Sequence, residues 1–288
     1  MRYTGLRERG GTDMAKPIVA LMYDFDKTLS PRNMQDYGFM DGLGMSADEF
    51  WSECTRLTKK NDMDSILSYM YLMLEKGKSS MLTKRENFNA LGKSVKLFPG
   101  VKSWFGRVND YCEQRGLKCE HYIISSGLKE IIEGTEIADE FKEIYAASFL
   151  YGANGLAEWP AMAVNFTSKT QFLYRVNKGV LDVTDQHSLN NYVPDEDRRV
   201  PFTNMIYFGD GDTDVPCMKL TRVNGGHSIA VYQEDEKEAS KLIREGRVDF
   251  AFPADYRKGR KLEKTVFTII DEIASLEALR AETARQQL

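Results

Sequence analysis

Two aspartates one residue apart, Asp24 and Asp26, directly follow an unbroken apolar run from Ile18 to Tyr23. Paired carboxylates can divide chemical work, because one can attack an electrophile while the other moves protons as general acid and base. Asp also opens turns and caps helices, and Pro31 ends the segment soon afterwards. On this spacing alone a turn and a catalytic pair are equally good interpretations, so the rest of the chain has to decide.

A second acidic motif, GDGDTD, follows the apolar run NMIYFG and places Asp210 and Asp214 four positions apart, with Asp212 between them. Clustered carboxylates need a cation, and a hard ion held by one or two carboxylates, waters and a phosphate is the usual Mg²⁺ arrangement. The spacing also resembles the start of a calcium loop. That loop requires glycine where Val215 stands and glutamate where Thr221 stands, so calcium is excluded.

Two further motifs offer groups that suit a phosphate. The segment IISSG contains Ser125, Ser126 and Gly127, whose hydroxyls and closely approachable amides could hold phosphoryl oxygens, although for this motif alone a helix N-cap is the preferred interpretation. Lys169 lies at the start of a predicted helix, where a cation is unfavourable against the helix dipole unless a buried anion compensates it. Taken alone, it is more simply a surface lysine.

The elements that must position these groups are short apolar strands that alternate with helices. This alternation predicts an α/β fold, a doubly wound, Rossmann-like parallel sheet in which the carboxyl ends of the strands share one edge and bring the polar groups together. The expected strands are Ile18–Tyr23, His121–Ser125, 143–150, 204–209 and 227–232, and the clearest helices end near Arg115 or span Lys169–Val176 and Glu236–Glu245.

The chain divides into three parts by pattern. Residues 1–16 are polar and without period, which predicts a flexible tail that contains Met14 as a second candidate start. Residues 17–32 and 97–288 are predicted to form the core, and residues 33–96 are predicted to form a small helical cap. Two possible capping boxes (Ser46 with Glu49, Thr83 with Glu86) and an apolar stripe at helical spacing support the helices of this insert: Met63, Ile66, Leu67, Met70 and Leu74.

The composition is typical of a soluble globular protein. The 288 residues are 42% hydrophobic and 28% charged with a net charge of -4, which argues against a nucleic-acid partner, and no apolar run is long enough to cross a membrane. The four cysteines show no CxxC spacing, which favours a reducing, cytoplasmic compartment. The densest basic cluster, 257–261, is interpreted as a solvated face.

In order and spacing, DFDKT at 24–28, the serine that follows YII, the isolated Lys169 and GDGDTD resemble the four motifs of the haloacid dehalogenase-like hydrolase superfamily. The helical insert after the first motif is similar to the cap of the phosphoserine phosphatase-like branch. The resemblance covers most of the expected core, and an ordered set of four motifs is far more specific than any single one.

The resemblance implies a role for each matched residue. Asp24 would attack phosphorus and become an aspartyl phosphate, and Asp26 would protonate the leaving oxygen and then activate water. Ser125 and Lys169 would complete the catalytic set by holding the phosphoryl oxygens. Thr28, Ser126 and Gly127 would assist in binding the substrate, and Mg²⁺ would be held by the Asp24 carboxylate, the Asp26 carbonyl, Asp210 and Asp214.

These residues predict a Mg²⁺-dependent phosphatase that hydrolyses a small phosphorylated metabolite. Two alternatives stay open: a phosphotransferase that passes the phosphoryl group to an acceptor other than water, and a non-catalytic protein that binds a phosphorylated ligand. DKT at 26–28 also matches the ion-pumping ATPase relatives, in which that aspartate is the nucleophile, but the lack of a membrane segment favours Asp24.

The sequence says least about specificity and assembly. Asp36, Tyr37 and Phe39 follow the first motif and could line a substrate pocket, although helix packing explains the aromatics about as well. Trp159 and Pro160 are expected in a loop or hairpin of unknown role. The oligomeric state is left undetermined.

Overall fold

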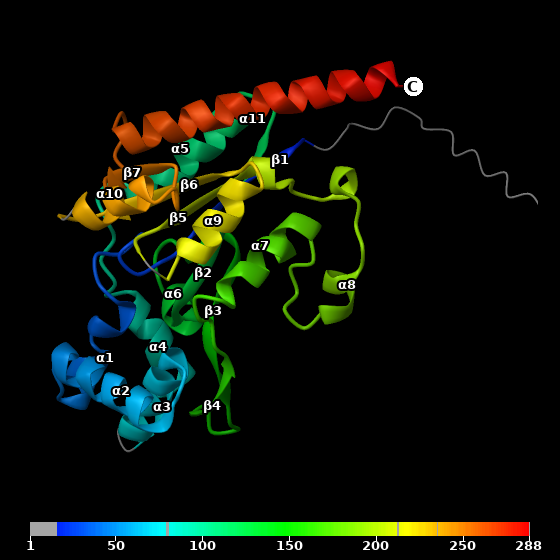
Figure 1. Cartoon of the computed structure of the whole chain (residues 1–288). Coiled ribbons are helices and arrows are strands. Elements are labelled where there is room, and N and C mark those ends of the chain that lie inside the picture. The colour runs from blue at the N-terminus through cyan, green and yellow to red at the C-terminus, as the bar shows by residue number, and fades with distance from the viewer. Residues whose placement is uncertain (1–15, 79–80, 212, 235, 288) are drawn as a thin grey trace, which may run out of the picture.

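The computed structural model describes residues 16–78, 81–211, 213–234 and 236–287 (Figure 1). The expected flexible tail, including Met14, lies outside the described residues apart from Lys16, and so does Asp212. None of the described helices is long and apolar enough to cross a membrane.

The described strands form one sheet of seven, and β1 (Ile18–Tyr23) lies at its centre between β2 (Lys118–Leu128) and β5 (Met205–Gly209). The strand order is β4-β3-β2-β1-β5-β6-β7. Every pairing is parallel except β3–β4 at one edge. The predicted α/β class and doubly wound parallel sheet are therefore confirmed. The outer strands are β3 (Phe141–Tyr151), β4 (Ala157–Met162), β6 (His227–Tyr232) and β7 (Phe250–Pro253).

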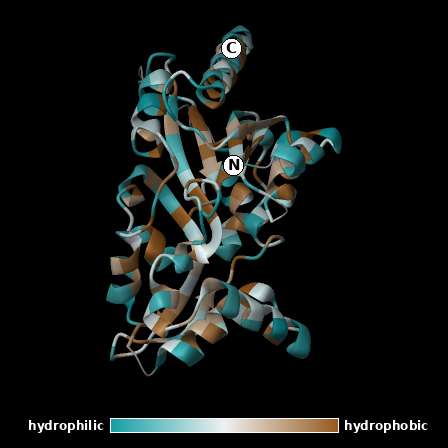
Figure 2. Cartoon of the chain, turned by 90° about the vertical axis from the view of Figure 1, so that its left-hand side faces the viewer, coloured by the Kyte–Doolittle hydropathy of each residue, from teal (hydrophilic) through white to brown (hydrophobic). Residues whose placement is uncertain are grey.

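Strand β1 is buried on both faces, as its unbroken apolar run predicts. Val19, Leu21 and Tyr23 pack into one hydrophobic cluster, whereas Ala20 and Met22 pack into a second cluster on the other face. Helices α5 (Val101–Glu113) and α11 (Lys261–Gln286) cover the first face, and α7 (Lys169–Lys178) and α9 (Val215–Val223) cover the second (Figure 1). In Figure 2 the apolar colour accordingly gathers in the strands and on the helix faces turned toward them.

Shorter elements complete the core. Helix α6 (Lys129–Glu133) follows β2, α8 (Gln186–Asn190) stands in the long connection between α7 and β5, and α10 (Glu236–Arg244) packs against β7. The remaining core elements are single 3-10 turns: η3 (Ala138–Glu140), η4 (Asp195–Asp197) and η5 (Phe202–Asn204).

The insert between β1 and α5 is helical, as expected. It contains η1 (Met34–Asp36), α1 (Phe39–Leu43), α2 (Ala47–Asn61), α3 (Ser65–Gly77) and α4 (Arg85–Gly92). Figure 1 shows these helices gathered below the sheet, next to the β3–β4 hairpin. Of the predicted apolar stripe, Met70 is fully buried and Ile66 lines a cavity, but Leu67 points outward with 38% of its surface exposed.

One of the two predicted capping boxes is present. The Ser46 hydroxyl accepts a hydrogen bond from the Glu49 amide at 3.2 Å, and the Glu49 carboxylate accepts one from the Ser46 amide at 2.8 Å. The second is wrong, because α4 has Lys84 as its N-cap and Thr83 lies one residue earlier. The Thr83 carbonyl accepts a hydrogen bond from Ala157, so the adjacent hairpin holds the chain extended at that point.

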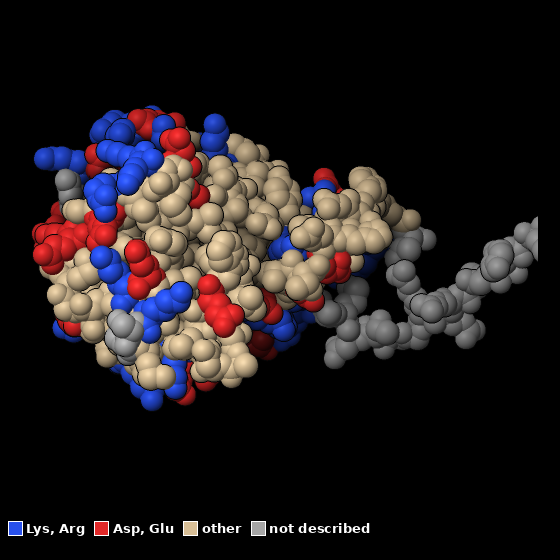
Figure 3. Space-filling view, turned by 90° about the horizontal axis from the view of Figure 1, so that it is seen from below, with Lys and Arg blue, Asp and Glu red and all other residues tan. Residues whose placement is uncertain are grey.

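Trp159 and Pro160 lie on β4, so the hairpin interpretation of this segment holds. Pro160 sits opposite Phe149, on the edge strand, where the lack of an amide proton is tolerated. The basic cluster at 257–261 is solvent-exposed as expected, and both Arg257 and Arg260 pair with Asp255. On the face seen from below the insert, positive and negative side chains are interspersed (Figure 3).

Candidate active site

Asp24 and Asp210 are brought together because their strands are neighbours. Asp24 directly follows β1 and Asp210 directly follows β5, and these two parallel strands pair along their length. The Asp24 amide donates to the Phe208 carbonyl at 2.9 Å, which extends the ladder to the first acid itself. The acids thus lie at the carboxyl edge of the sheet, where the strand order reverses around β1 and ligands commonly bind.

Three carboxylates converge at this edge. Asp24, Asp210 and Asp214 each offer an oxygen, and these oxygens lie within 4.8 Å of one another. Asp214 is fully buried and both of its oxygens already accept hydrogen bonds: Oδ1 from the Tyr207 hydroxyl at 2.8 Å and Oδ2 from the Asp210 amide at 3.3 Å. The oxygens of Asp210 receive no comparable donor from the described residues.

Lys169 is completely buried between two of these acids. Its Nζ donates to Asp24 Oδ1 at 2.9 Å and to Asp214 Oδ1 at 2.8 Å. Burial lowers the pKa of Lys169, but the carboxylates of Asp214 and Asp24 outweigh burial and raise it, so the lysine is charged. Two buried anions therefore compensate a cation at the first residue of α7.

The acids themselves resist ionisation in the protein alone. Burial raises the pKa of Asp24 to about 6, an effect that Lys169 opposes and that repulsion from Asp214 reinforces. Burial, together with repulsion from Asp214 and Asp24, raises the pKa of Asp210 to about 7. Three clustered carboxylates thus share a single buried lysine, so the site holds an excess of negative charge that a hard cation would neutralise.

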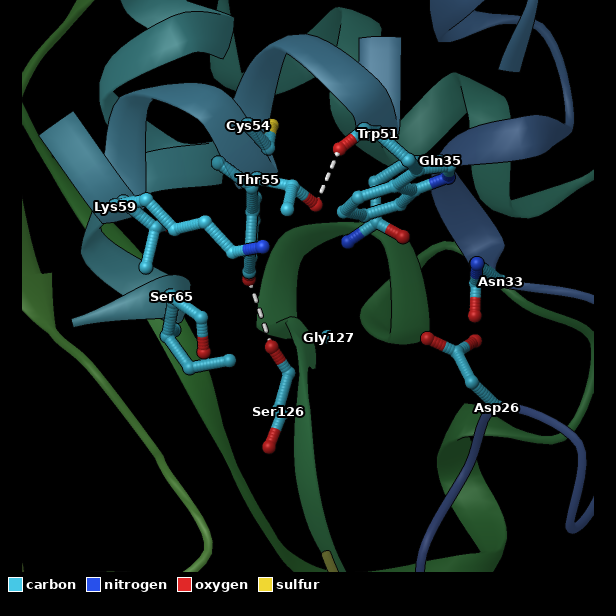
Figure 4. A pocket seen from close by; sticks show the side chains of 13 residues that line it. Asp26, Asn33, Gln35, Trp51, Cys54, Thr55, Lys59, Ser65, Ser126 and Gly127 are labelled. Atoms are coloured by element: carbon cyan, nitrogen blue, oxygen red, sulfur yellow. Dashed lines mark hydrogen bonds between the residues drawn. The ribbon is translucent and has the colours of Figure 1, made fainter. Parts of the chain in front are cut away.

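Asp26 points away from this cluster toward a cavity (Figure 4). Its Oδ1 accepts a hydrogen bond from the Met34 amide at 2.8 Å, which fixes the carboxylate, and the chain turns directly after Asp26 through Lys27 at φ 57°. Burial raises the pKa of Asp26 well above its usual range, and the charge of Asp24 adds to this rise. A raised pKa favours the protonated form of a carboxyl group, and that form can donate a proton.

Thr28 occupies a supporting position rather than facing the cavity. It is completely buried, and its carbonyl accepts a hydrogen bond from the Tyr256 hydroxyl at 2.8 Å. Its own hydroxyl has no hydrogen-bond partner among the described residues. The contact with Tyr256 anchors the loop that carries Asp26 to the segment before α11.

The serine motif lies within β2, because this strand continues to Leu128 beyond the predicted end at Ser125. The Ser125 hydroxyl accepts from the Gly127 amide at 3.1 Å, and the Ser126 carbonyl accepts from the Tyr69 hydroxyl at 2.7 Å. A Cβ atom at Gly127 would lie 2.1 Å from Met34 Cε and 3.2 Å from Asp26 Oδ2. A side chain at this position would have to displace the end of Met34 and would crowd the Asp26 carboxylate, so glycine suits the close approach of this strand.

A cavity of about 400 Å³ opens above Asp26, Ser126 and Gly127, and helices α2 and α3 form its walls (Figure 4). Asp36, Tyr37 and Phe39 do not line it, so that prediction is wrong. Asp36 accepts from the Trp51 indole at 3.1 Å, the Tyr37 hydroxyl meets Ser30, and Phe39 packs on Phe88. The lining consists of Asp26, Asn33, Gln35, Trp51, Cys54, Thr55, Thr58, Lys59, Ser65, Ile66, Tyr69, Ser126 and Gly127.

Sequence reasoning missed the wall residues on α2, although a signal for them existed. The five lining residues of α2 recur at spacings of three and four, so they share one face of the helix.

Sequence reasoning also missed a hydrogen-bonded link between the insert and the core. Asp64, the N-cap of α3, accepts a hydrogen bond from Asn165 at 3.0 Å, and the Asn165 carbonyl accepts from the Lys169 amide.

Relatives of the chain were compared at the levels of family, sequence and fold. No family model matches it. An uncharacterized protein of Borreliella burgdorferi is 31% identical over 275 residues, which cover 85% of this chain and 94% of that protein, so the two chains belong to one family. A HAD family hydrolase from Salmonella enterica serovar Typhi superposes with a TM-score of 0.56 at 18% identity, covering 85% of this chain and 70% of that one.

A substrate-bound phosphoserine phosphatase gives a TM-score of 0.54 at 14% identity and covers 84% of this chain and 97% of its own. The fold is that of the haloacid dehalogenase-like hydrolases, in its phosphoserine phosphatase-like form. A probable phosphoserine phosphatase from Vibrio cholerae has the same haloacid dehalogenase-like fold, with a TM-score of 0.54 at 15% identity over 96% of this chain and 68% of that chain.

Proposed function

We propose that this haloacid dehalogenase-like protein is a Mg²⁺-dependent phosphatase that hydrolyses a small phosphomonoester. The observation that carries the proposal is the position of Asp24, which ends the central strand and is held by the buried Lys169 beside two further carboxylates. The solved phosphatases that share the fold support a phosphoryl-transfer chemistry at this edge of the sheet.

Asp24 would act as the nucleophile. Because Lys169 binds its Oδ1, the other carboxylate oxygen is available to attack phosphorus and form an aspartyl phosphate while the ester oxygen leaves. The raised pKa of Asp26 suits the donation of a proton to that oxygen. In the second step Asp26 would take a proton from water, whose oxygen attacks the phosphorus and releases phosphate, and Asp24 regains its carboxylate.

The phosphoryl group would be held by Ser125 and Lys169, with the backbone around Ser126 and Gly127 close by. Thr28 would contribute by keeping the Asp26 loop in place through its contact with Tyr256, rather than by touching the substrate. Positive charge fixed next to the transferred group is the main means by which enzymes stabilise such transition states.

The donor set fits Mg²⁺, because it consists of clustered carboxylates, two of them buried and one half-buried, with an excess of negative charge. Asp24, Asp210 and the Asp26 carbonyl would be ligands, and Asp214, whose oxygens both already accept hydrogen bonds, would act mainly as support. Bound Mg²⁺ would supply neutralising charge for the phosphoryl oxygens.

The insert at 33–96 would be a cap over a core formed by 17–32 and 97–288, since its helices wall the cavity above Asp26. The cavity size suits a small phosphorylated metabolite rather than a macromolecule. The net charge of -4, together with the interspersed charges on the face shown in Figure 3, argues against a nucleic-acid partner, and the four free cysteines favour a cytoplasmic location.

The test is phosphate release from p-nitrophenyl phosphate in the presence of Mg²⁺. Asp24→Asn should reduce the rate by at least about a thousandfold, because no other carboxylate can form the intermediate. Asp41→Asn, an exposed substitution on α1, is the control and should keep normal activity. Circular dichroism checks that both variants are folded.

Substantial activity of Asp24→Asn would contradict the mechanism. If Asp26→Asn instead abolished formation of the covalent phosphoenzyme while Asp24→Asn retained it, Asp26 would be the nucleophile. Dominant transfer of the phosphoryl group to an added alcohol would favour the phosphotransferase, and binding of phosphorylated metabolites without turnover would favour the non-catalytic protein.

A further inference from the structure

The cavity above Asp26 is unevenly charged. Of its lining residues, only Asp26 and Lys59 carry a formal charge, and all the others are neutral. Because Asp26 faces the reacting end, Lys59, which is itself solvent-exposed, is the one charged group that the walls offer to the rest of a bound molecule. Figure 4 shows the Lys59 side chain extending from α2 along the cavity.

Lys59 forms no ion pair with a described residue, and the acids around the cavity are already engaged elsewhere. Glu53 of α2 pairs with Lys76 and Arg56. Asp64 caps α3 and accepts from Asn165. Asp36 accepts from Trp51. The wall therefore presents one unpaired cation and no unengaged carboxylate.

A second observation concerns a buried amide. Gln35 is 2% exposed and lines the cavity, and its Oε1 has no hydrogen-bond partner among the described residues. The hydroxyl of Ser126, another lining residue, is buried and unpartnered in the same way. Buried oxygens without a partner are costly, so a bound molecule that donates a hydrogen bond to Gln35 relieves this cost.

We propose that the substrate is the phosphomonoester of a hydroxy acid: its alcohol part bears a carboxylate for Lys59 and a hydroxyl for Gln35, and bears no ammonium group. The inference rests on the proposed phosphatase function and narrows its substrate. Apart from Asp26, which faces the reacting end, the lining offers an ammonium group no carboxylate partner, and that group would share the cavity with the positive charge of Lys59, which is unfavourable.

The experiment compares two molecules of equal skeleton, 3-phosphoglycerate and O-phosphoserine, which differ only in a hydroxyl in place of the ammonium group. The expected kcat/KM is at least about tenfold higher for 3-phosphoglycerate. A third compound, glycerol 3-phosphate, lacks the carboxylate. In Lys59→Met the ratio of kcat/KM for 3-phosphoglycerate to that for glycerol 3-phosphate should fall about tenfold, and Lys59→Arg should restore part of it.

The matched control is Lys60→Met, which removes the neighbouring lysine that is exposed like Lys59 but does not line the cavity, and it should leave this ratio unchanged. Equal or better turnover of O-phosphoserine would overturn the inference, and so would an unchanged ratio in Lys59→Met.

If the proposed phosphatase function is wrong, the outcome differs from those that overturn the substrate inference. No phosphate would then be released from any compound, p-nitrophenyl phosphate included. In that case, calorimetric binding of 3-phosphoglycerate and O-phosphoserine to the wild-type chain with Mg²⁺ tests the same preference. Binding of O-phosphoserine that is as tight as that of 3-phosphoglycerate would overturn the inference there as well.

Discussion

Replacing Lys169 with Met tests the centre of the site directly. The substitution keeps most of the side-chain volume and removes the one buried positive charge between Asp24 and Asp214. Both carboxylates are at least nine-tenths buried, so each loses a charged donor without gaining access to water. Breaking one side of a buried ion pair typically costs about 3–5 kcal/mol, because the remaining charge is left uncompensated.

This loss is large relative to the stability of ordinary proteins, about 5–15 kcal/mol. In urea, with a denaturant slope near 3 kcal/mol per molar for a chain of this size, the unfolding midpoint should fall by about 1 M or more. Without the lysine, which lowers the pKa of Asp24, this carboxylate protonates more readily, and its protonation relieves part of the repulsion. The difference in stability from wild type should therefore shrink as the pH is lowered from 8 to 5.5.

The assay is equilibrium unfolding in urea at both pH values, with phosphate release measured in parallel. Phosphate release should fall about 100- to 1,000-fold, as for the loss of one charge-stabilising group. Lys219→Met on α9, an exposed lysine, serves as the control and should change stability by less than about 0.5 kcal/mol. If Lys169→Met unfolds at the same urea concentration as wild type at pH 8, Lys169 is not a buried ion-pair partner and the reasoning fails.

Three other perturbations have defined outcomes. In Gly209→Ala the new Cβ would lie 2.4 Å from Asp214 Cγ, so both the urea midpoint and the rate of phosphate release should fall, the rate at least tenfold. In Gly211→Ala the new Cβ meets no atom within 4 Å, so the urea midpoint should equal that of wild type. Equal urea midpoints for the two variants would contradict the packing. Burial lowers the pKa of His121 to about 3, so the stability that the neutral imidazole contributes is complete above pH 6.5 and declines as the pH falls. Urea unfolding of wild type and His121→Gln at pH 6.5 and pH 5 measures this decline. Between these pH values the free energy of unfolding of wild type should fall by about 2 kcal/mol more than that of His121→Gln. Removal of metal with EDTA should abolish phosphate release, and added Mg²⁺ should restore it and raise the thermal midpoint; activity that survives chelation would argue against a metal-dependent enzyme.

The sequence by itself was sufficient for the parts of the fold that rest on local pattern. Strand β1 has the predicted bounds because an apolar run without alternation places apolar side chains on both faces of the strand, and both faces are buried only in the middle of a covered sheet. The capping box at Ser46 is equally local, since both partners lie within one helical turn. The edge hairpin strand β4 and the short β7 were not predicted as strands, because each is brief and contains proline.

For the site, the sequence identified residue types and the order of the strands that carry them. The acids after β1 and β5 had to meet once these strands were parallel neighbours. That Lys169 would pair with Asp24 and Asp214 could not be read from spacing, because the lysine is far from both in the chain and its partners are set by how α7 packs on the sheet.

The cavity was decided by tertiary structure alone. Tyr37 and Phe39 follow the first motif yet turn into the packing between helices, whereas Trp51 and Lys59, farther along the chain, face the cavity. Which face of a helix becomes a wall depends on the angle at which α2 and α3 cross above Asp26, and a local pattern carries no information about that angle. Local sequence therefore identified the candidate reacting groups, whereas the packing of the insert decided which side chains line the cavity.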